Sequence, residues 1–306
     1  MKRQGPKNIV ASVQARLVER SRELDVEHQL TLARFGGERL LYRLSKSKVA
    51  DRFILKGAAL LLMWLGEPIR PTKDVDLLGL GDTSADALTR VFVDLCAVES
   101  PEDGLTFLPE SVHVEAIRED QEYGGMRVKL MAMLGNVRIP LQVDVGAGDA
   151  VVPPPEVLEY PGLLDLPRAR LRAYRPETSI AEKTEAMVRL ALANSRMKDF
   201  FDIQRLAETR TFDGETMRLA VAATFTRRGI ELPGERPLAL TSEFADDAQK
   251  RIQWAAFVRR TRRPELADLS AIIATLDRFL WPVLQAAARR KPWPRLWSNG
   301  GPWKER

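Results

Sequence analysis

Three consecutive prolines at positions 153–155 constrain the fold of this chain more than any other sequence feature. Proline lacks the backbone N–H that helices and sheet ladders use, so neither element continues through the run. Before it, apolar stretches with strand-like and helix-like spacing alternate, and after it apolar residues recur at helical spacing. A chain of 306 residues is long enough for two packed domains. We therefore expect an α+β fold, with a mixed-sheet domain and helical N-terminal segment over residues 1–155 and a helical domain over residues 156–306.

The apolar spacing also predicts individual elements. In the first part, strands are expected over residues 75–78, 112–117, 126–133 and 137–145, and helices over residues 8–49, 58–65 and 85–98. In the second part, helices are expected over residues 177–193, 198–207, 214–228, 242–259 and 264–288. The final residues, 291–306, hold three tryptophans among prolines and glycines and form either an ordered arm or a loose tail.

Charged residues are unevenly distributed along the chain. Residues 1–150 hold 20 Lys and Arg against 22 Asp and Glu, whereas residues 151–306 hold 27 against 20. The basic residues of the second part gather in three clusters: Arg168/Arg170/Arg172/Arg175, Arg259/Arg260/Arg262/Arg263 and Arg289/Arg290/Lys291. A basic part beside a carboxylate-bearing part is typical of an enzyme that acts on a polyanion such as nucleic acid. Solvated helix faces give the same counts, so charge alone leaves both interpretations open.

Cysteine, histidine and apolar runs exclude several classes of protein. The single cysteine, Cys96, excludes an internal disulfide and a cysteine-based zinc site, and two histidines exclude a histidine-rich metal site. The longest apolar run, residues 58–65, is far shorter than the ~18 residues of a membrane-spanning helix. The basic N-terminus lacks the apolar stretch of a signal peptide. We expect a cytoplasmic protein with no membrane partner.

Asp74 and Asp76 are the first candidate metal ligands. They are separated by one residue, so on a strand both carboxylates project from the same face. Two carboxylates this close repel each other unless a cation neutralises them, and hard oxygen ligands suit magnesium, which also coordinates phosphates. An acidic pair alone also occurs by chance on solvated strand ends.

Two further features favour a magnesium site over a solvated pair. Asp144 lies in an otherwise largely apolar strand, where an ionised carboxylate is costly to bury without a partner, and a second magnesium ion would be that partner. Lys56, Gly57 and Ala58 come directly before a predicted helix. Glycine at this point lets a triphosphate approach the backbone N–H groups of the helix N-terminus.

With these motifs in order, the chain resembles the AbiEii nucleotidyltransferase toxin family of type IV toxin–antitoxin and abortive-infection systems. The resemblance covers roughly residues 50–210 and depends on five motifs in the expected order: LKGAAL at 55–60, RPTKDVD at 70–76, LQVDVGAGD at 141–149, ETSIAEKTEAM at 177–187 and SRMKDFFD at 195–202. It implies a DNA polymerase β-like nucleotidyltransferase fold with two Mg2+ ions and a nucleoside triphosphate (NTP) as substrate.

The resemblance also implies roles for individual residues. The metal ligands would be Asp74, Asp76 and Asp144; the catalytic residues Asp74, Asp76, Lys183 and Asp202; and the nucleotide-binding residues Lys56, Gly57, Ala58, Lys183 and Asp199. Without it, Lys183 would be interpreted as a surface lysine paired with Glu182 or Glu185. Many family members have serine after the glycine of the first motif, and Ala58 removes that hydroxyl.

The function that the resemblance implies is a toxin that transfers a nucleotide from NTP to RNA, at the tRNA 3′ end, and is neutralised by an AbiEi-like antitoxin. An alternative is nucleotidyl or phosphoryl transfer to a protein side chain, which the basic second part disfavours. A third possibility is a catalytically inactive binding module. The presence of all three carboxylates and Lys183 argues against it.

Overall fold

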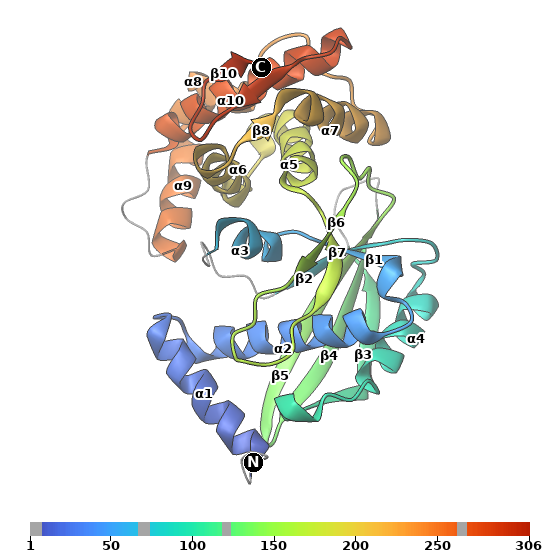
Figure 1. Cartoon of the computed structure of the whole chain (residues 1–306). Coiled ribbons are helices and arrows are strands. Elements are labelled where there is room, and N and C mark those ends of the chain that lie inside the picture. Colours follow the sequence, from blue (N-terminus) through green and yellow to red (C-terminus); the bar gives the residue numbers. More distant parts are fainter. Residues whose placement is uncertain (1–7, 67–73, 118–123, 262–267) are drawn as a thin grey trace. The chain divides into compact units, whose positions relative to one another are not determined.

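The computed structural model describes residues 8–66, 74–117, 124–261 and 268–306 (Figure 1). The chain forms two compact units: Met1–Gly148 with Glu156–Ala173, and Asp149–Pro155 with Tyr174–Arg306. The proline run thus lies in a segment where the chain enters the second unit and then returns to the first. Residues 70–73, part of the second motif, lie outside the described residues.

A seven-stranded mixed sheet forms the centre of the described part of the first unit, and it confirms the expected α+β class. Its order is β3-β4-β5-β2-β1-β7-β6, with β1–β7 and β2–β5 parallel and the other neighbours antiparallel. The strands are β1 (Phe53–Lys56), β2 (Val75–Gly79), β3 (Leu105–Ala116), β4 (Met126–Leu134), β5 (Val137–Ala147), β6 (Glu156–Glu159) and β7 (Arg170–Ala173).

Strands β6 and β7 correct the expectation that the chain after residue 155 is purely helical. Each is four residues long, too short to show an alternating pattern in the sequence. Their pairing depends on a distant partner, because β7 lies beside β1 with Ala173 opposite Leu55. Three arginines from the basic second part, Arg168, Arg170 and Arg172, therefore belong to the first unit.

The helices of the first unit pack on this sheet. They are α1 (Ile9–Glu23), α2 (His28–Lys46), α3 (Ala59–Leu65) and α4 (Ala85–Cys96), with short 3-10 turns η1 (Ala50–Arg52) and η2 (Pro101–Asp103). Asn8 and Ser84 cap α1 and α4 through their side-chain oxygens. Gly36 allows α2 to lie close to β5, because a Cβ there would be 2.9 Å from Leu141.

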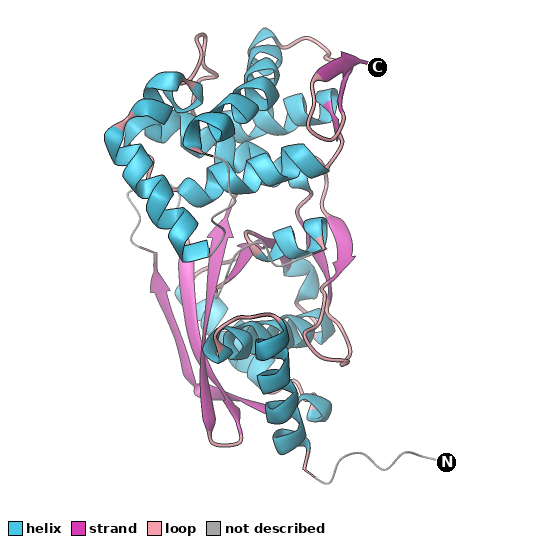
Figure 2. Ribbon diagram, turned by 90° about the vertical axis from the view of Figure 1, so that its left-hand side faces the viewer, coloured by secondary structure: helices cyan, strands magenta, loops and turns pink. Residues whose placement is uncertain are grey.

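The described part of the second unit is mainly helical, and Figure 2 shows helices as its main element. Its elements are α5 (Pro176–Leu190), η3 (Ala191–Ala193), α6 (Met197–Thr209), α7 (Gly214–Arg227), η4 (Leu238–Leu240), α8 (Ser242–Asp246), α9 (Ala248–Thr261) and α10 (Leu269–Arg289). The single helix expected over residues 242–259 is wrong. Asp247 adopts an extended conformation (ψ 127°) and ends α8, and its carboxylate accepts a bond from the Lys250 N–H in the first turn of α9. Of the helix expected over residues 264–288, residues 264–267 lie outside the described residues.

The C-terminal residues form an ordered arm. Strands β9 (Arg295–Trp297) and β10 (Trp303–Glu305) join β8 (Phe212–Asp213) in a small sheet. Trp297 is fully buried, and its indole N–H donates to the carbonyl of Ala207 at 2.7 Å.

Helix α10 is the one helix among the described residues that is long and apolar enough to cross a membrane by length and composition. Half of its apolar window is buried inside the protein. Leu276, Phe279 and Leu280 are fully buried against its neighbours. Such burial is typical of the core helix of a globular protein.

Candidate active site

A row of charged residues crosses four neighbouring strands of the first unit. In the sheet register, Lys56 of β1 lies opposite Asp76 of β2, Asp76 lies opposite Asp144 of β5, and Asp144 lies opposite Arg127 of β4. Directly opposed residues project from the same face of a sheet. The register therefore brings together the aspartates and the lysine that the motifs predict, and flanks the two carboxylates with one cation on each side.

Local strand patterns explain why these polar residues share one face. Asp76 is the least buried residue of β2, between buried Val75 and Leu77. Asp144 is likewise partly exposed between the fully buried Val143 and Val145. Alternation along each strand turns the apolar neighbours to the opposite face, so the carboxylates reach solvent while their strands stay in the core.

Asp144 has a protein partner that the sequence reasoning missed. The Arg127 guanidinium holds its carboxylate with two hydrogen bonds, from Nε to Oδ1 at 2.9 Å and from Nη2 to Oδ2 at 2.8 Å, and the Gln142 amide adds a third at 3.2 Å. Asp144 therefore already has a cationic partner within the protein, and its role as a magnesium ligand stays a prediction. The side chain is 21% exposed and already neutralised.

The sequence does contain a signal for Arg127. Gly135 and Asn136 form a two-residue connection between β4 and β5, with Leu134 opposite Val137. Such turns fix the register of a hairpin, and counting back along both strands places residue 127 opposite residue 144. Hydrogen bonding to Asp144 raises the pKa of Arg127, and the negative charges of Asp144 and Asp74 raise it further. Asp74, directly before β2, thus contributes to the electrostatics of the row.

The turn after β1 places its backbone against Asp76. Gly57 has a φ of +74°, and a Cβ at this position would lie 1.9 Å from Oδ2 of Asp76. Only glycine fits both this backbone conformation and this contact. Ala58 follows as the residue before α3 and makes no side-chain capping bond.

The donor chemistry of the row fits a hard divalent cation, since Asp74, Asp76 and Asp144 supply carboxylate oxygens. The carboxylate of Asp144 is hydrogen-bonded to Arg127. Among the described residues, no group of three His, Cys, Asp or Glu side chains is arranged to hold a metal ion. The two bonds from Arg127 occupy part of the acceptor capacity of this carboxylate, so an ion that uses Asp144 would share the carboxylate with Arg127 or displace it.

Lys183 lies in the second unit, in a largely buried ionic cluster. Its Nζ donates to Oδ1 of Asp199 at 2.5 Å and to Oδ2 of Asp202 at 2.8 Å. Asp199 and Asp202, three residues apart on α6, share the face that meets Lys183 on α5. The Lys183 side chain is only 14% exposed, so the interpretation as a surface lysine is wrong.

The cations of this cluster control the charge of Asp199. Burial alone would raise the pKa of its carboxyl, but Lys183 and Arg196 outweigh burial and hold the pKa below its ordinary value. The Nε of Arg196 lies 2.8 Å from Oδ2 of Asp199. Asp199 is thus an anion that fixes the position of the Lys183 ammonium group.

A second buried network lies in the same unit and was not predicted. Glu185 is fully buried and forms ion pairs with Arg189 and Arg228. The hydroxyl of Tyr174 lies within hydrogen-bond distance of Asp149 and Glu182, and burial raises its pKa strongly. These contacts tie the last residue of the third motif to the helix that carries Lys183.

Comparisons with known proteins agree with this combination of motifs. The family model described as "Nucleotidyl transferase AbiEii toxin, Type IV TA system" matches residues 39–286. No curated protein sequence matches the chain.

Solved structures show similarity at low sequence identity. A crystal structure from H. pylori has 14% identity and a TM-score of 0.47, covering 87% of this chain and 98% of its own. JHP933 from Helicobacter pylori has 14% identity and a TM-score of 0.42, covering 86% and 93%. An antigenic nucleotidyltransferase-like protein from Paracoccidioides brasiliensis has 18% identity and a TM-score of 0.36, covering 77% and 90%.

Proposed function

Because the chain belongs to the AbiEii nucleotidyltransferase toxin family, we propose that it transfers a nucleotide from NTP to the 3′ end of a tRNA. Family membership makes the chain a nucleotidyltransferase, and a type IV toxin–antitoxin system implies an antitoxin partner. The observation that carries the proposal is the row of Lys56, Asp76, Asp144 and Arg127, which places two carboxylates between two cations on one face of the sheet. The RNA acceptor, the cytoplasmic location and an AbiEi-like antitoxin are parts of the proposal.

The carboxylates of the row would hold the metal. Asp74, Asp76 and Asp144 are the proposed ligands of two magnesium ions, and Arg127 would share the Asp144 carboxylate with an ion or give way to it. When bound, such ions neutralise the triphosphate and favour the deprotonated acceptor hydroxyl. Arg127 and Lys56 stand at the two ends of the row and are the cations closest in register to the carboxylates.

Other residues of the chain would act on the triphosphate directly. Lys183 would donate to the departing pyrophosphate, and Asp199 and Asp202 would hold its ammonium group in place. Gly57 and Ala58 would leave the backbone before α3 open to the phosphates, with Lys56 beside them. Asp202 belongs to the catalytic set through its contact with Lys183.

The test is transfer of label from NTP. The purified protein is incubated with total RNA and total protein, using each of the four NTPs labelled at the α-phosphate. We expect label on RNA of tRNA size. Oxidation of the RNA 3′ end with periodate before the reaction should abolish this labelling. Asp76→Asn, shown to be folded by circular dichroism, should reduce labelling by at least ~10²-fold, because a charged metal ligand becomes neutral.

Two results would contradict the proposal. Label on protein and none on RNA would identify a protein acceptor, and parallel reactions with γ-labelled NTP would separate phosphoryl from nucleotidyl transfer. Undiminished labelling by folded Asp76→Asn would remove the charged row from the chemistry.

A further inference from the structure

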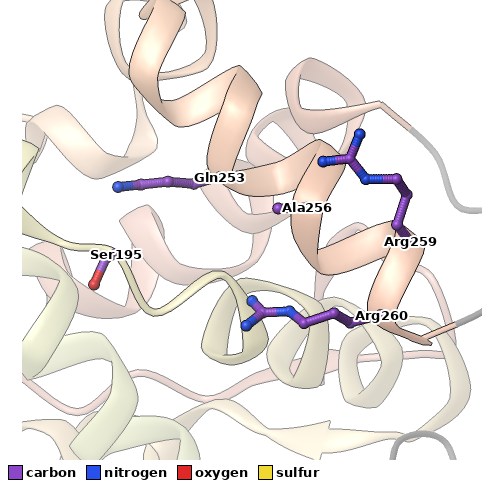
Figure 3. A pocket seen from close by; sticks show the side chains of 5 residues that line it. All are labelled: Ser195, Gln253, Ala256, Arg259 and Arg260. Carbon is purple, nitrogen blue, oxygen red and sulfur yellow. The ribbon is translucent and has the colours of Figure 1, made fainter.

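A pocket of about 590 Å3 opens beside α9 in the second unit (Figure 3). It is lined by Ser195, Gln253, Ala256, Arg259 and Arg260. In Figure 3, Gln253 and Arg260 extend from α9 toward the side where Ser195 lies. A hydroxyl, an amide and two guanidinium groups are all able to donate hydrogen bonds.

The shape of the pocket follows from the two faces of α9. Trp254 and Phe257 turn inward, 6% and 5% exposed, and Phe257 packs on Phe201 of α6 with ring centroids 5.5 Å apart. Gln253, Ala256 and Arg260 are spaced by three and four residues and so form one stripe on another face. Because Ala256 has no side chain beyond Cβ, the stripe is hollow between its two polar neighbours.

A buried lysine fixes the walls of the pocket. Lys250 is 3% exposed, and its Nζ donates to the carbonyl of Asn194 at 2.9 Å and to Oε1 of Gln253 at 3.1 Å. The first bond holds the loop that carries Ser195, and the second holds the Gln253 carbonyl, which turns the amide NH2 away from the lysine. The Ser195 loop and the Gln253 amide are therefore held in place before any ligand arrives.

The charge around the pocket is positive. Among the described residues, Arg259, Arg260 and Lys250 form no ion pair with a carboxylate. Arginines on or directly beside α5, α6 and α7 do form such pairs, for example Arg189, Arg196 and Arg228. Unpaired guanidinium groups that line a hollow suit a phosphate group, which accepts two parallel N–H bonds from each.

We propose that this pocket binds a backbone phosphate of a single-stranded RNA. The RNA as ligand rests on the proposed function, whereas the phosphate chemistry rests on the pocket itself. Among the residues that the structure describes, no aromatic ring lines the pocket to stack on a base, because Trp254 and Phe257 are turned inward, so contact with the backbone rather than with a base is expected. The loop that carries Ser195 leads directly into α6, whose Asp199 and Asp202 hold Lys183. The proposed RNA contact is therefore close in sequence to the cluster that contains this lysine.

A pair of substitutions on adjacent residues tests the pocket without changing charge. Ala256→Phe fills the hollow, whereas Ala255→Phe adds the same ring at an exposed position outside it. Binding of a short fluorescein-labelled single-stranded RNA is measured for both. We expect Ala256→Phe to weaken binding on the order of tenfold or more and Ala255→Phe to leave it within about twofold, since the loss of a charged hydrogen bond costs about one decade of affinity.

A second pair tests the charge and remains informative if Ala256→Phe does not fold. Arg260→Gln removes a pocket cation, and Arg251→Gln removes one from the opposite face of α9, where Arg251 pairs with Asp246. Arg260→Gln should weaken RNA binding and flatten the slope of log affinity against log salt by ~0.7 for the lost phosphate contact. Arg251→Gln should leave that slope nearly unchanged. Equal RNA affinity and salt slope in all folded variants would overturn the proposal.

Two controls separate this inference from the proposed function. Calorimetry with inorganic triphosphate tests whether the pocket serves the nucleotide instead, and a loss of triphosphate binding in Ala256→Phe with unchanged RNA binding would overturn the RNA assignment. If the wild type binds RNA in a manner sensitive to Ala256→Phe but labels only protein, the pocket stands and the proposed acceptor fails. If the wild type labels RNA but Ala256→Phe binds RNA as tightly as the wild type, the pocket assignment is contradicted and the proposed function is not.

Discussion

Arg127 and Gly57 show how single residues set the chemistry of the charged row. Arg127 holds Asp144 through two hydrogen bonds, and Gly57 brings the backbone against Asp76. Each contact joins groups that are far apart in the sequence, and each restricts where one carboxylate can point. The geometry of the row therefore depends on residues that are not themselves metal ligands.

Replacement of Gly57 by alanine should disable the site and cost more stability than backbone strain alone, because the new Cβ would also lie 2.6 Å from the Cβ of Asp76, which moves only with its strand. The new Cβ would lie 1.9 Å from Oδ2 of Asp76, so the carboxylate must move, and the φ of +74° is strained for alanine. Displacement of a reacting group by about 1 Å can cost ~10² in rate. Nucleotidyl transfer and thermal unfolding would be measured together.

Gly66→Ala is the matched control. Gly66 has a φ of +76°, but a Cβ added there would have no atom of the described residues within 4 Å, so alanine meets only the backbone strain there. We expect a loss of about 1–2 kcal/mol in Gly66→Ala from that strain, a larger loss in Gly57→Ala, and a fall in rate in Gly57→Ala alone. Equal rates in the two variants would show that the contact with Asp76 is unimportant.

At the scale of elements, α2 is unusual because it buries several charged residues. Arg39 and Arg43 both donate to Asp103, and none of these three side chains is more than 3% exposed. Arg39 also donates to the carbonyl of Pro167, which anchors the segment between β6 and β7. Such a network is satisfied only when both chain segments are in place, so it couples the helix to the sheet.

Glu38 on the same helix predicts a pH dependence of stability. Burial raises the pKa of its carboxyl to about 7, despite a bond from the Leu163 N–H and the nearby arginines. A carboxyl whose pKa is raised in the folded state stabilises the fold fully when the pH is below its unfolded pKa of about 4.5. That contribution to the free energy of unfolding is lost as the pH rises through about 7. The wild type should therefore lose on the order of 3 kcal/mol between pH 5 and pH 8 through this group.

Glu38→Gln should remove this dependence, because glutamine keeps an acceptor for Leu163 without titrating. Urea unfolding at pH 5 and pH 8 measures the difference between the two proteins. The free energy of unfolding of Glu38→Gln should increase relative to that of the wild type as the pH rises. If the free energy of unfolding changes equally with pH in the two proteins, Glu38 does not have the raised pKa that its burial implies.

On the scale of the molecule, the end of the chain completes the core of the second unit. The ring centroids of Trp297 and of Phe279 on α10 are 4.8 Å apart. Trp303 stacks on the same Phe279 ring, with centroids 5.7 Å apart and an interplanar angle of 2°. The Trp297 indole also bonds to the last turn of α6. The arm thus joins α6 and α10, which are separated in the sequence.

Trp297→Ala should destabilise the second unit by about 3–5 kcal/mol, because it leaves a large cavity among the buried rings and removes the indole bond to the Ala207 carbonyl, which then keeps only its bond from the Gly300 N–H. For a unit of this size the melting temperature should fall by on the order of 10 °C. Trp303→Phe, which keeps a ring against Phe279, should lower it much less. A melting temperature unchanged in Trp297→Ala would mean that the arm is dispensable.

The sequence alone predicts much of the first unit because its elements carry local signals. Strands β4 and β5 alternate, and their Gly135–Asn136 turn sets the register that pairs residues 127 and 144. The short spacing of Asp74 and Asp76 likewise predicts a shared face before any fold is known. Helices α5, α6 and α7 follow from apolar spacing in the same way.

What only the tertiary structure decided are contacts between segments far apart in the chain. Strands β6 and β7 form because β1 offers β7 an edge, not because four residues favour a strand. Likewise, Lys183 meets Asp199 and Asp202 only because α5 packs against α6, and the pocket beside α9 exists because Phe257 turns inward against Phe201. Local propensity is determined by neighbours in the sequence, whereas these pairings are stabilised by burial and charge that arise only once the chain has folded.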